Sequence, residues 1–413
     1  MKEYKVGSLF AGVGGICLGF QNAKTEKSGY KLVWANEIDE FACTTYRTNF
    51  KHTLLEGDIK KVLHPELIDQ EIEDAKRVYE EAEEDLKKEK LQILAQMQHD
   101  RDEQFDKYSR FHEQILSEPI DVLNGGFPCQ AFSIAGEQKG FEDERGNLFL
   151  NIVDLIEQLG QRHSKPRILF LENVKNLQSH DKGRTYKVIK AKLEECGYTI
   201  YEKVLNTMDF SDLPQNRERI YIIGFLNKED AEKFTSFSPE RLNLLKKTKT
   251  SKDRANDVKR IIDYSLTVQT AEKYYYTREK YPHYFVTQEE FKNSDKGTRI
   301  NLGEQVDEMY QFYQCRRGMY VRKNKSNVCP TLTANMGTGG HNVPLIKVAD
   351  GVRKLTPAET FKLQGFPVGE GYTLPTKHNG KTYSDAQLYK QAGNAVSVPV
   401  ITMLATEILN TVE

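Results

Sequence analysis

Residues 6–21 read VGSLFAGVGGICLGFQ, a run in which an apolar strand pattern passes through a glycine-rich turn into a helical pattern. We expect a buried strand over Val6 to Phe10 and a helix over about 14–21. Glycines such as Gly12 and Gly14, placed between a strand and a helix, let a ligand approach backbone N–H groups closely. The run lacks GxGxxG spacing, so alone it fits a structural turn as well as a binding loop.

The pattern of a strand followed by a helix repeats along the chain. Short apolar runs lie at 32–35, 121–125, 168–171 and 220–225, with helical patterns between them. Strands that alternate with helices predict an α/β fold whose mostly parallel sheet carries helices on both faces. After residue 225 strand and helix patterns no longer alternate, and the chain becomes polar, basic and rich in tyrosine. This change predicts a second, smaller domain.

The composition excludes several classes of protein. Among 413 residues, 38% are hydrophobic and 29% are charged, as in a soluble globular chain rather than a disordered or fibrous one. No apolar run is long enough to span a membrane and no leader pattern opens the chain, so we expect a cytoplasmic location and no membrane contact. Six cysteines without CxxC or metal-ligand spacing predict reduced thiols and no metal site.

A net charge of -1 hides an uneven distribution. Residues 66–118 contain 17 acidic and 8 basic side chains and no Gly or Pro, with apolar residues at helical spacing. They predict one long helix or a helical hairpin, either a solvated insertion or an arm that binds a partner or a second copy. Residues 226–345 contain 21 basic and 15 acidic side chains, an excess that suits a phosphate backbone.

Three features carry candidate chemistry. Cys129 follows a strand in the loop GGFPCQ, a position that favours a nucleophile over an inert core thiol. Glu172 ends the next strand, so its carboxyl is expected at the same edge of the sheet. Gln215, Arg217 and Arg219 alternate along an approaching strand, which places the three side chains on one face, suited to contacts with an anion or a base.

Two acidic residues suggest a nucleoside cofactor. Glu37 follows the second strand about twenty residues after the glycines, where a carboxylate can bind both hydroxyls of a ribose. Asp58 lies at the end of a third candidate strand and could accept a hydrogen bond from an exocyclic amine.

Taken together, these motifs resemble the DNA cytosine-5 methyltransferases of bacterial restriction–modification systems. The resemblance covers essentially the whole chain, in the usual order: FAGVGG (10–15), ANEID (35–39), GDI (57–59), GGFPCQAFS (125–133), RGNLF (145–149), LENVKN (171–176), QNRERIYIIGF (215–225), RKLTPAETFKLQGFP (353–367) and QAGNAVSVPV (391–400). It implies methyl transfer from S-adenosylmethionine to C5 of a cytosine that has swung out of a DNA duplex, after the Cys129 thiolate attacks C6.

The resemblance also implies roles for individual residues. It assigns catalysis to Cys129, Glu172, Arg217 and Gln130. It assigns contacts with S-adenosylmethionine to Phe10, Gly12, Gly14, Asn36, Glu37, Ile38, Asp58, Ile59, Pro128, Leu148 and Asn394. It assigns contacts with DNA to Arg219, Ser133, Arg316, Arg317, Arg322, Lys323 and Thr331.

The implied architecture has two domains across a DNA cleft. Residues 1–225 form the catalytic domain of an S-adenosylmethionine-dependent methyltransferase, with the 66–118 insertion, and 380–413 return to it as a helix. Residues 226–379 form the target-recognition domain and hinge. We expect a monomer that acts on double-stranded DNA alongside a possible cognate restriction endonuclease. The alternatives are an RNA cytosine-5 methyltransferase of the same fold, a nicotinamide oxidoreductase on a similar sheet, and a catalytically inactive DNA-binding homologue.

Overall fold

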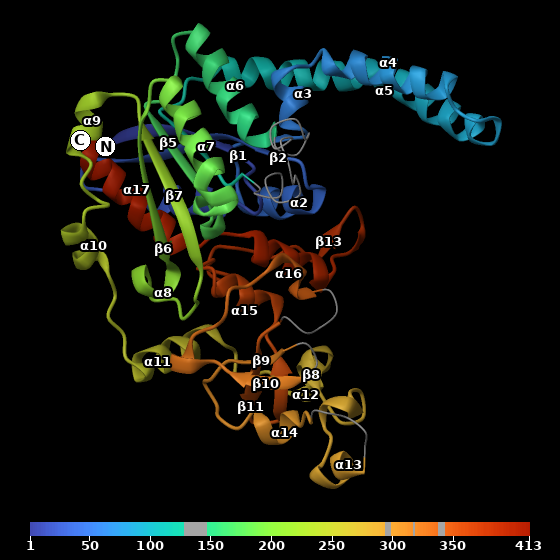
Figure 1. Ribbon diagram of the computed structural model, residues 1–413, viewed down its shortest axis with the longest axis vertical. Helices are drawn as coiled ribbons and strands as arrows, with labels where there is room; N and C mark the ends of the chain where they lie inside the picture. Colours follow the sequence, from blue (N-terminus) through green and yellow to red (C-terminus); the bar gives the residue numbers. More distant parts are fainter. Residues whose placement is uncertain (128–146, 294–298, 317–318, 338–342) are drawn as a thin grey trace.

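The computed structural model describes residues 1–127, 147–293, 299–316, 319–337 and 343–413, with only the backbone of residue 147. Figure 1 shows a large sheet flanked by helices, a smaller sheet below it, and a pair of helices that projects from the upper end.

The large sheet has seven strands in the order β3-β2-β1-β4-β5-β7-β6. Their bounds are β1 Lys2–Leu9, β2 Ser28–Glu37, β3 Thr53–Glu56, β4 Val122–Gly125, β5 Ile168–Val174, β6 Thr199–Asn206 and β7 Glu218–Phe225. Neighbours from β3 to β5 are parallel, and β7 is antiparallel to both β5 and β6. The expected α/β fold with a mostly parallel sheet is therefore confirmed.

Helices cover both faces of this sheet because its central strands are apolar on both sides, as in β5, where Ile168 to Leu171 are at most 1% exposed. One face carries α3 (Ile59–Leu63), α6 (Asn147–Gln161) and α7 (Arg184–Glu195). The other carries α1 (Gly15–Asn22), α9 (Lys228–Lys233) and α17 (Val398–Val412). The remaining helices of this part are α2 (Glu40–Asn49) and α8 (Thr207–Phe210).

The C-terminal segment is built into the large sheet's flank. A Cβ on Gly19 of α1 would lie 2.4 Å from the Ile401 side chain of α17, so the two helices meet at a position where only glycine fits. The stretch 385–412 is apolar and long enough to cross a membrane, but 72% of its apolar window is buried. It consists of two helices, α16 (Asp385–Asn394) and α17, separated at 395–397.

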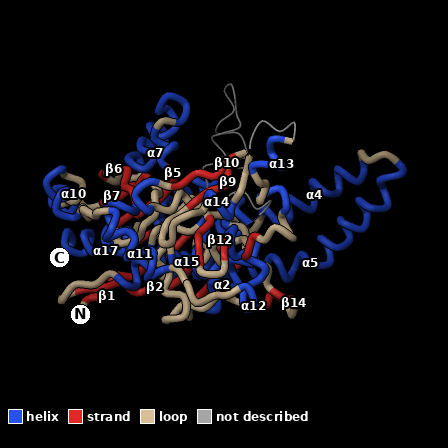
Figure 2. The backbone as a smooth tube through the Cα atoms, turned by 90° about the horizontal axis from the view of Figure 1, so that it is seen from below, coloured by secondary structure: helices blue, strands red, loops and turns tan. Residues whose placement is uncertain are grey.

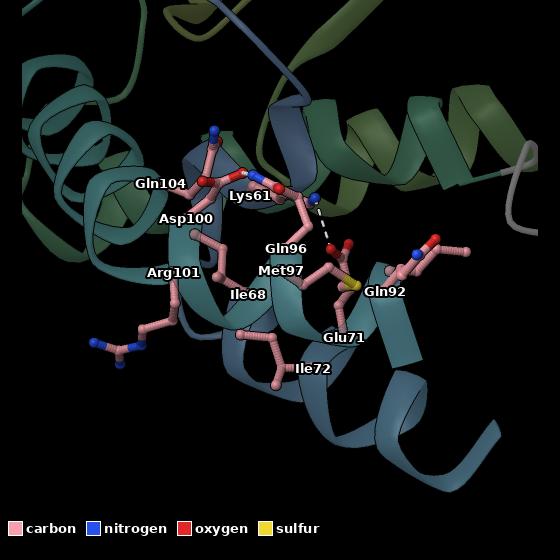
Figure 3. Close-up of a pocket in the computed structure, with 11 residues that line it drawn as sticks. Lys61, Ile68, Glu71, Ile72, Gln92, Gln96, Met97, Asp100, Arg101 and Gln104 are labelled. Atoms are coloured by element: carbon pink, nitrogen blue, oxygen red, sulfur yellow. Dashed lines mark hydrogen bonds and ion pairs between the residues drawn. The ribbon is translucent and has the colours of Figure 1, made fainter. Parts of the chain in front are cut away.

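The 66–118 segment is a helical hairpin of α4 (Leu67–Glu80) and α5 (Glu84–Ser117), which we call the arm. Figures 1 and 2 both show it extending away from the rest of the molecule. A groove of about 510 Å³ runs between the two helices, floored by Ile68, Ile72 and Met97 and bordered by the Lys61–Glu71 ion pair (Figure 3). The base of α5 belongs to the core of the sheet, since Tyr108, Ile115 and Leu116 are buried there.

A histidine joins the arm to the body. His64 Nε2 lies 2.7 Å from Asp154 Oδ2, and His64 Nδ1 lies 3.0 Å from Glu66 Oε1. Burial by itself lowers the pKa of His64, but the hydrogen bonds to the two carboxylates outweigh it and the pKa is raised.

The smaller sheet is antiparallel, with the order β10-β9-β11-β12-β8. Its strands are β8 Tyr275–Tyr276, β9 Tyr313–Arg316, β10 Tyr320–Lys323, β11 Leu345–Val348 and β12 Gly351–Lys354. Around it lie α11 (Ser251–Ile261), α12 (Val268–Ala271), α13 (Gln288–Lys292), α14 (Leu302–Gln305) and α15 (Pro357–Lys362). The helix α10 (Pro239–Leu245) instead lies beside α17, where Arg241 binds Glu407, and the hairpin of β13 (Lys377–His378) and β14 (Lys381–Thr382) lies beside α2, where the His378 ring contacts Phe41 (Figure 1). Short 3₁₀ turns occur at η2 Lys175–Gln178, η3 His180–Gly183, η4 Glu272–Tyr274, η5 Pro282–Tyr284, η6 Lys325–Asn327 and η7 Ala334–Gly337.

A buried ion pair fastens the smaller sheet to α15. Arg353 of β12 and Glu359 of α15 are joined by two hydrogen bonds of 2.8 and 2.7 Å, and their side chains are 0% and 3% exposed. Glu359 also accepts from the backbone N–H groups of Thr356 and Asp263. The carboxylate is thus fully hydrogen-bonded, which is the condition under which a buried charge is tolerated.

Candidate active site

Two acidic side chains lie at the carboxyl-terminal edge of the large sheet. Glu37 ends β2 and Glu172 lies near the end of β5, and the strands β1 and β4 lie between them. Because these strands are parallel, their ends share one edge, where open α/β sheets bind ligands.

Glu37 holds the glycine turn. Its carboxylate accepts from the Gly12 N–H at 2.7 Å, the Ile38 N–H at 2.9 Å and the Asp39 N–H at 2.8 Å. Burial raises the pKa of Glu37, while these backbone hydrogen bonds act in the opposite direction. The sequence predicted Glu37 and Gly12 in one site, and the structure brings them into direct contact.

The next turn, Gly57-Asp58, is held from several sides. The Asn36 amide donates to the carbonyls of Leu55 and Gly57, so its donors are occupied by backbone. The Asp58 carboxylate caps α3 by accepting from the Lys60 N–H at 2.9 Å. Ile59 is 3% exposed and packs in the core, which leaves only its backbone for a ligand.

The surroundings of Glu37 suit a nucleoside. Ile38 is 67% exposed beside it, an apolar surface on which a flat ring can lie. Gly12 has φ +55°, and a Cβ there would meet nothing within 4 Å, so the turn opens onto free space. Gly14 has φ +83° and packs on the Phe50 ring, which makes its role a packing one. Phe10, with φ +53°, is half-buried at the start of the turn.

Glu172 is the buried carboxyl of the other half of the site. It is 7% exposed, and its Oε1 lies 3.0 Å from Arg219 Nε of the neighbouring strand β7. Burial raises the pKa of Glu172, although the charges of Arg219 and Arg217 oppose the shift. Its Oε2 lies 3.4 Å from the position of a Cβ on Gly126, so the carboxyl faces the segment that leads to Cys129.

Asn173 was not singled out by the sequence, but it positions the same segment. Its amide donates to the Phe127 carbonyl at 2.8 Å, and its side-chain oxygen accepts from the Val174 N–H. Its sequence signal is its place directly after Glu172 in the motif LENVKN (171–176). The predicted residues Pro128, Cys129, Gln130, Ser133 and Arg317 lie outside the described part of the chain.

Arg217 ties three segments together. Its guanidinium donates to the Leu332 carbonyl at 3.0 Å, the Gly393 carbonyl at 3.1 Å and the Ala395 carbonyl. Burial, with help from the charge of Arg219, lowers the pKa of Arg217 to about 9. In this structure the two terminal nitrogens of the guanidinium donate hydrogen bonds to backbone carbonyls.

The expectation of one strand carrying all three side chains of the QxRxR motif is wrong. Strand β7 begins at Glu218, so only Arg219 lies within it. Gln215 forms an isolated bridge with Cys329 and donates to the Leu363 carbonyl at 2.7 Å. Residues 329–332 of the smaller domain pair with the backbone just before Glu218. Strand β7 therefore begins at Glu218 and does not extend back to Gln215.

The remaining predicted residues lie around this edge or on the smaller sheet. Thr331 is exposed and donates to the Asn216 carbonyl at 2.6 Å. Asn394 is exposed at the end of α16, between the two carbonyls that bind Arg217. Leu148 is half-buried in α6.

The β9–β10 hairpin separates the predicted basic residues onto two faces. Arg316 pairs with Tyr320, and Arg322 pairs with Gln314, so these four side chains share one face. Arg316, Tyr320 and Arg322 are exposed. Lys323 is on the other face, where its ammonium binds Glu308 at 2.5 Å and Asp307 at 3.7 Å.

The face with Arg316 and Arg322 is turned toward the large sheet. Along β9 and β11, Tyr313 and Leu345 belong to the smaller sheet's outer apolar cluster. Ile346, on the opposite face, packs in the cluster that also contains Ala35 and Tyr46 of the large sheet's side. Arg316 and Arg322 lie on the same face as Ile346, but they are exposed because they lie outside this packed cluster.

The chain matches the family described as C-5 cytosine-specific DNA methylase over residues 4–75 and 73–410. The chain belongs to this family. The methylase is 41% identical over 406 residues to the type II methyltransferase M.Bsp6I of Bacillus sp. (strain RFL6), with 98% of each chain covered. It is 33% identical over 410 residues to the type II methyltransferase M.HaeII of Haemophilus aegyptius, with 99% of this chain and 94% of the relative covered.

Solved structures show the same fold. The Dnmt2 methyltransferase of S. pombe aligns with a TM-score of 0.57 at 16% identity, covering 99% of both chains. A putative DNA modification methyltransferase encoded within an E. coli prophage aligns with a TM-score of 0.57 at 19% identity, again over 99% of both chains. The family match and the type II relatives confirm the family resemblance, and this methylase is a DNA cytosine-5 methyltransferase.

Proposed function

We propose that this methylase acts through a covalent adduct between Cys129 and C6 of a cytosine held against Glu172. Cytosine C5 is a poor nucleophile until a thiolate adds to C6 and its electrons move from the C5–C6 double bond toward N3 and C5. Addition of Cys129 would make C5 able to take the methyl group of S-adenosylmethionine, which would leave as the neutral thioether S-adenosylhomocysteine. Loss of the C5 proton to solvent would then break the Cys129–C6 bond, expel the thiolate and restore the C5–C6 double bond.

Glu172 is suited to hold the ring through N3 and the exocyclic amine. The support is its burial at the β5 edge, with Oε2 directed at the backbone of Gly126, three residues before Cys129. A carboxyl whose pKa is raised can carry the proton that N3 needs as negative charge develops. Arg219 keeps this carboxyl in place. The roles of Arg217 and Gln130 in orienting the ring stay predictions.

The chemistry and shape of the turn at Glu37 fit S-adenosylmethionine. Glu37 would bind the ribose, Ile38 would cover the adenine, and Asp58 would accept from its exocyclic amine. The open space at Gly12 and the exposed Asn394 would receive the methionine end. When bound, S-adenosylmethionine supplies an electrophilic methyl group on a sulfonium. The other residues that we propose to line the S-adenosylmethionine site are Phe10, Asn36, Ile59, Pro128 and Leu148.

The substrate we propose is a short site in double-stranded DNA. A cytosine within a duplex has to swing out to reach a buried carboxyl, so a second surface must hold the DNA. Residues 226–379 carry the basic excess, and Arg316 and Arg322 extend from the face turned to the large sheet. Ser133, Arg317 and Thr331 are further candidates for phosphate or base contacts. Lys323, paired with two carboxylates, is a weaker one than the sequence suggested.

The biological setting we propose follows from the type II relatives. The methylase would work as a cytoplasmic monomer that marks one sequence and protects it from a cognate restriction endonuclease. In this arrangement residues 1–225 and 380–413 form the catalytic domain.

The adduct can be trapped with duplex DNA that contains 5-fluorocytosine, because fluorine does not leave C5 as a cation. With S-adenosylmethionine, the wild-type chain should give a complex that survives denaturing electrophoresis, and sequencing of the trapped DNA gives the site. Cys129→Ser should bind the duplex without forming the complex. A trapped complex from Cys129→Ser, or none from the wild type on DNA of diverse sequence, contradicts the mechanism.

A further inference from the structure

The arm reaches the proposed cofactor subsite through one side chain. Tyr108, on α5, is 6% exposed, and its hydroxyl oxygen accepts from the Asp58 N–H at 3.2 Å. A Cβ on Gly57 would lie 2.5 Å from that oxygen and 2.8 Å from the ring, so the ring rests directly on the Gly57 backbone. Glycine at 57 is what allows this close approach.

The other contacts of this turn come from its immediate surroundings. The Gly57 N–H donates to the Glu37 carbonyl at 2.9 Å, the Gly57 carbonyl accepts from Asn36 at 2.9 Å, and the Asp58 carboxylate accepts from the Lys60 N–H. The Asp58 N–H alone is bonded by a side chain 50 residues away in sequence. Without Tyr108, this half-buried donor would lose its protein partner.

The ring of Tyr108 is itself fixed by the arm. Phe111, one turn further along α5, contacts it edge-on with ring centres 6.3 Å apart, and the Lys107 ammonium lies 5.3 Å from its centre. Leu116 and Ile115 anchor the same helix in the core. The hydroxyl position is therefore determined by the seating of α5, which extends outward into the exposed arm.

We propose that Tyr108 is a positioning residue that holds the Gly57-Asp58 turn for the adenine of S-adenosylmethionine, so that the arm is a structural part of the cofactor subsite. This inference rests on the proposed assignment of Asp58 to the cofactor. It gives the base of the arm a function that its acidic, helical sequence does not suggest.

The test is Tyr108→Phe, which keeps the ring and removes the oxygen. Amide hydrogen exchange of the cofactor-free protein should show faster exchange at Asp58, by about 5-fold or more. The dissociation constant for S-adenosylmethionine, measured by calorimetry, should rise by about 3- to 10-fold, because the bound turn must be re-ordered. The KM for DNA should stay unchanged.

Two controls separate positioning from packing. Tyr79→Phe removes a hydroxyl from α4, farther out on the arm, and should alter neither quantity. Ile189→Val, on α7, removes a methyl group from the same core without touching α5, and should lower the thermal unfolding midpoint without raising the dissociation constant for S-adenosylmethionine. If Tyr108→Phe leaves the exchange of Asp58 and the cofactor affinity unchanged, or behaves like Ile189→Val, the inference is overturned.

Asp58→Ala, which removes the acceptor that Asn would retain, distinguishes this inference from the proposed function. If Asp58→Ala weakens S-adenosylmethionine binding and Tyr108→Phe does not, only the role of Tyr108 is wrong. If Asp58→Ala leaves the affinity unchanged, the assignment of Asp58 fails, and the role of Tyr108 fails with it.

Discussion

The buried pair of Arg353 and Glu359 allows a quantitative prediction about the join between the smaller sheet and α15. Arg353→Met removes two hydrogen bonds of 2.7 and 2.8 Å and leaves a carboxylate that is 3% exposed without its counter-charge. Breaking a buried ion pair on one side costs about 3–5 kcal/mol. Two backbone N–H donors remain on Glu359, so we expect the lower end, about 3 kcal/mol.

A change of this size shifts the local opening equilibrium by about 100-fold, since 1.4 kcal/mol is a factor of ten. Hydrogen exchange across β12 and α15 should show it, and the KM for DNA should rise while the affinity for S-adenosylmethionine stays constant. The double variant Arg353→Met with Glu359→Gln removes both charges and should recover about half of the loss.

Either of two results would contradict this coupling between Arg353 and Glu359. One is an Arg353→Met chain whose exchange across β12 and α15 matches the wild type within a factor of two. The other is a double variant that is destabilised by the full sum of its single variants, because a coupled pair must be non-additive.

Four further predictions concern catalysis, recognition and the arm. Glu172→Gln should slow adduct formation with 5-fluorocytosine DNA by about 100-fold or more while cofactor affinity holds; equal losses in both would count against its role. Arg322→Ala should relax base preference at one position of the site by about 5- to 100-fold in a methylated random library, whereas Lys323→Ala should not; a uniform weakening across sequences would mean a phosphate contact instead. His64→Gln should lower the thermal midpoint most at low pH. A raised pKa contributes stability that is fully present below about pH 6.5 and is lost as the pH rises through the folded value, so a loss that grows toward pH 8 would contradict the pairing. Replacing 75–95 by a short Gly/Ser bridge should preserve methylation of duplex DNA, since the base of the arm stays; an inactive but folded product would assign the outer arm a role in catalysis.

The large sheet was predictable because its signals are local. Most of its strands are short apolar runs, although β6 (Thr199–Asn206) was not predicted, and the proposed functional residues Glu37 and Glu172 lie at or near the ends of strands. A parallel arrangement then brings these positions to one edge without any further information.

The parts that were not predictable depend on contacts between distant segments. Tyr108 meets Asp58 only because α5 folds back against the sheet, and nothing in the acidic helical pattern marks that tyrosine. Arg217 has the spacing of a strand residue, but β7 begins at Glu218 and the Arg217 guanidinium binds the carbonyls of Leu332, Gly393 and Ala395. The sequence places Arg316, Arg322 and Lys323 close together, but the pairing register of β9 and β10 puts Lys323 on the opposite face of the hairpin from the two arginines.

The packing of α17 against α1 has a consequence for synthesis of the protein. The strands of the large sheet are complete by residue 225, but the helix that covers Gly19 and Phe20 ends at 412. At about 5–20 residues per second, a ribosome needs roughly 10 to 40 s to make the intervening chain. During that time the apolar flank of α1 faces solvent or a chaperone, and the backbone carbonyls that Arg217 binds do not yet exist. The nascent chain therefore cannot assemble its catalytic edge until translation has passed the last helix, which delays methylation until after synthesis.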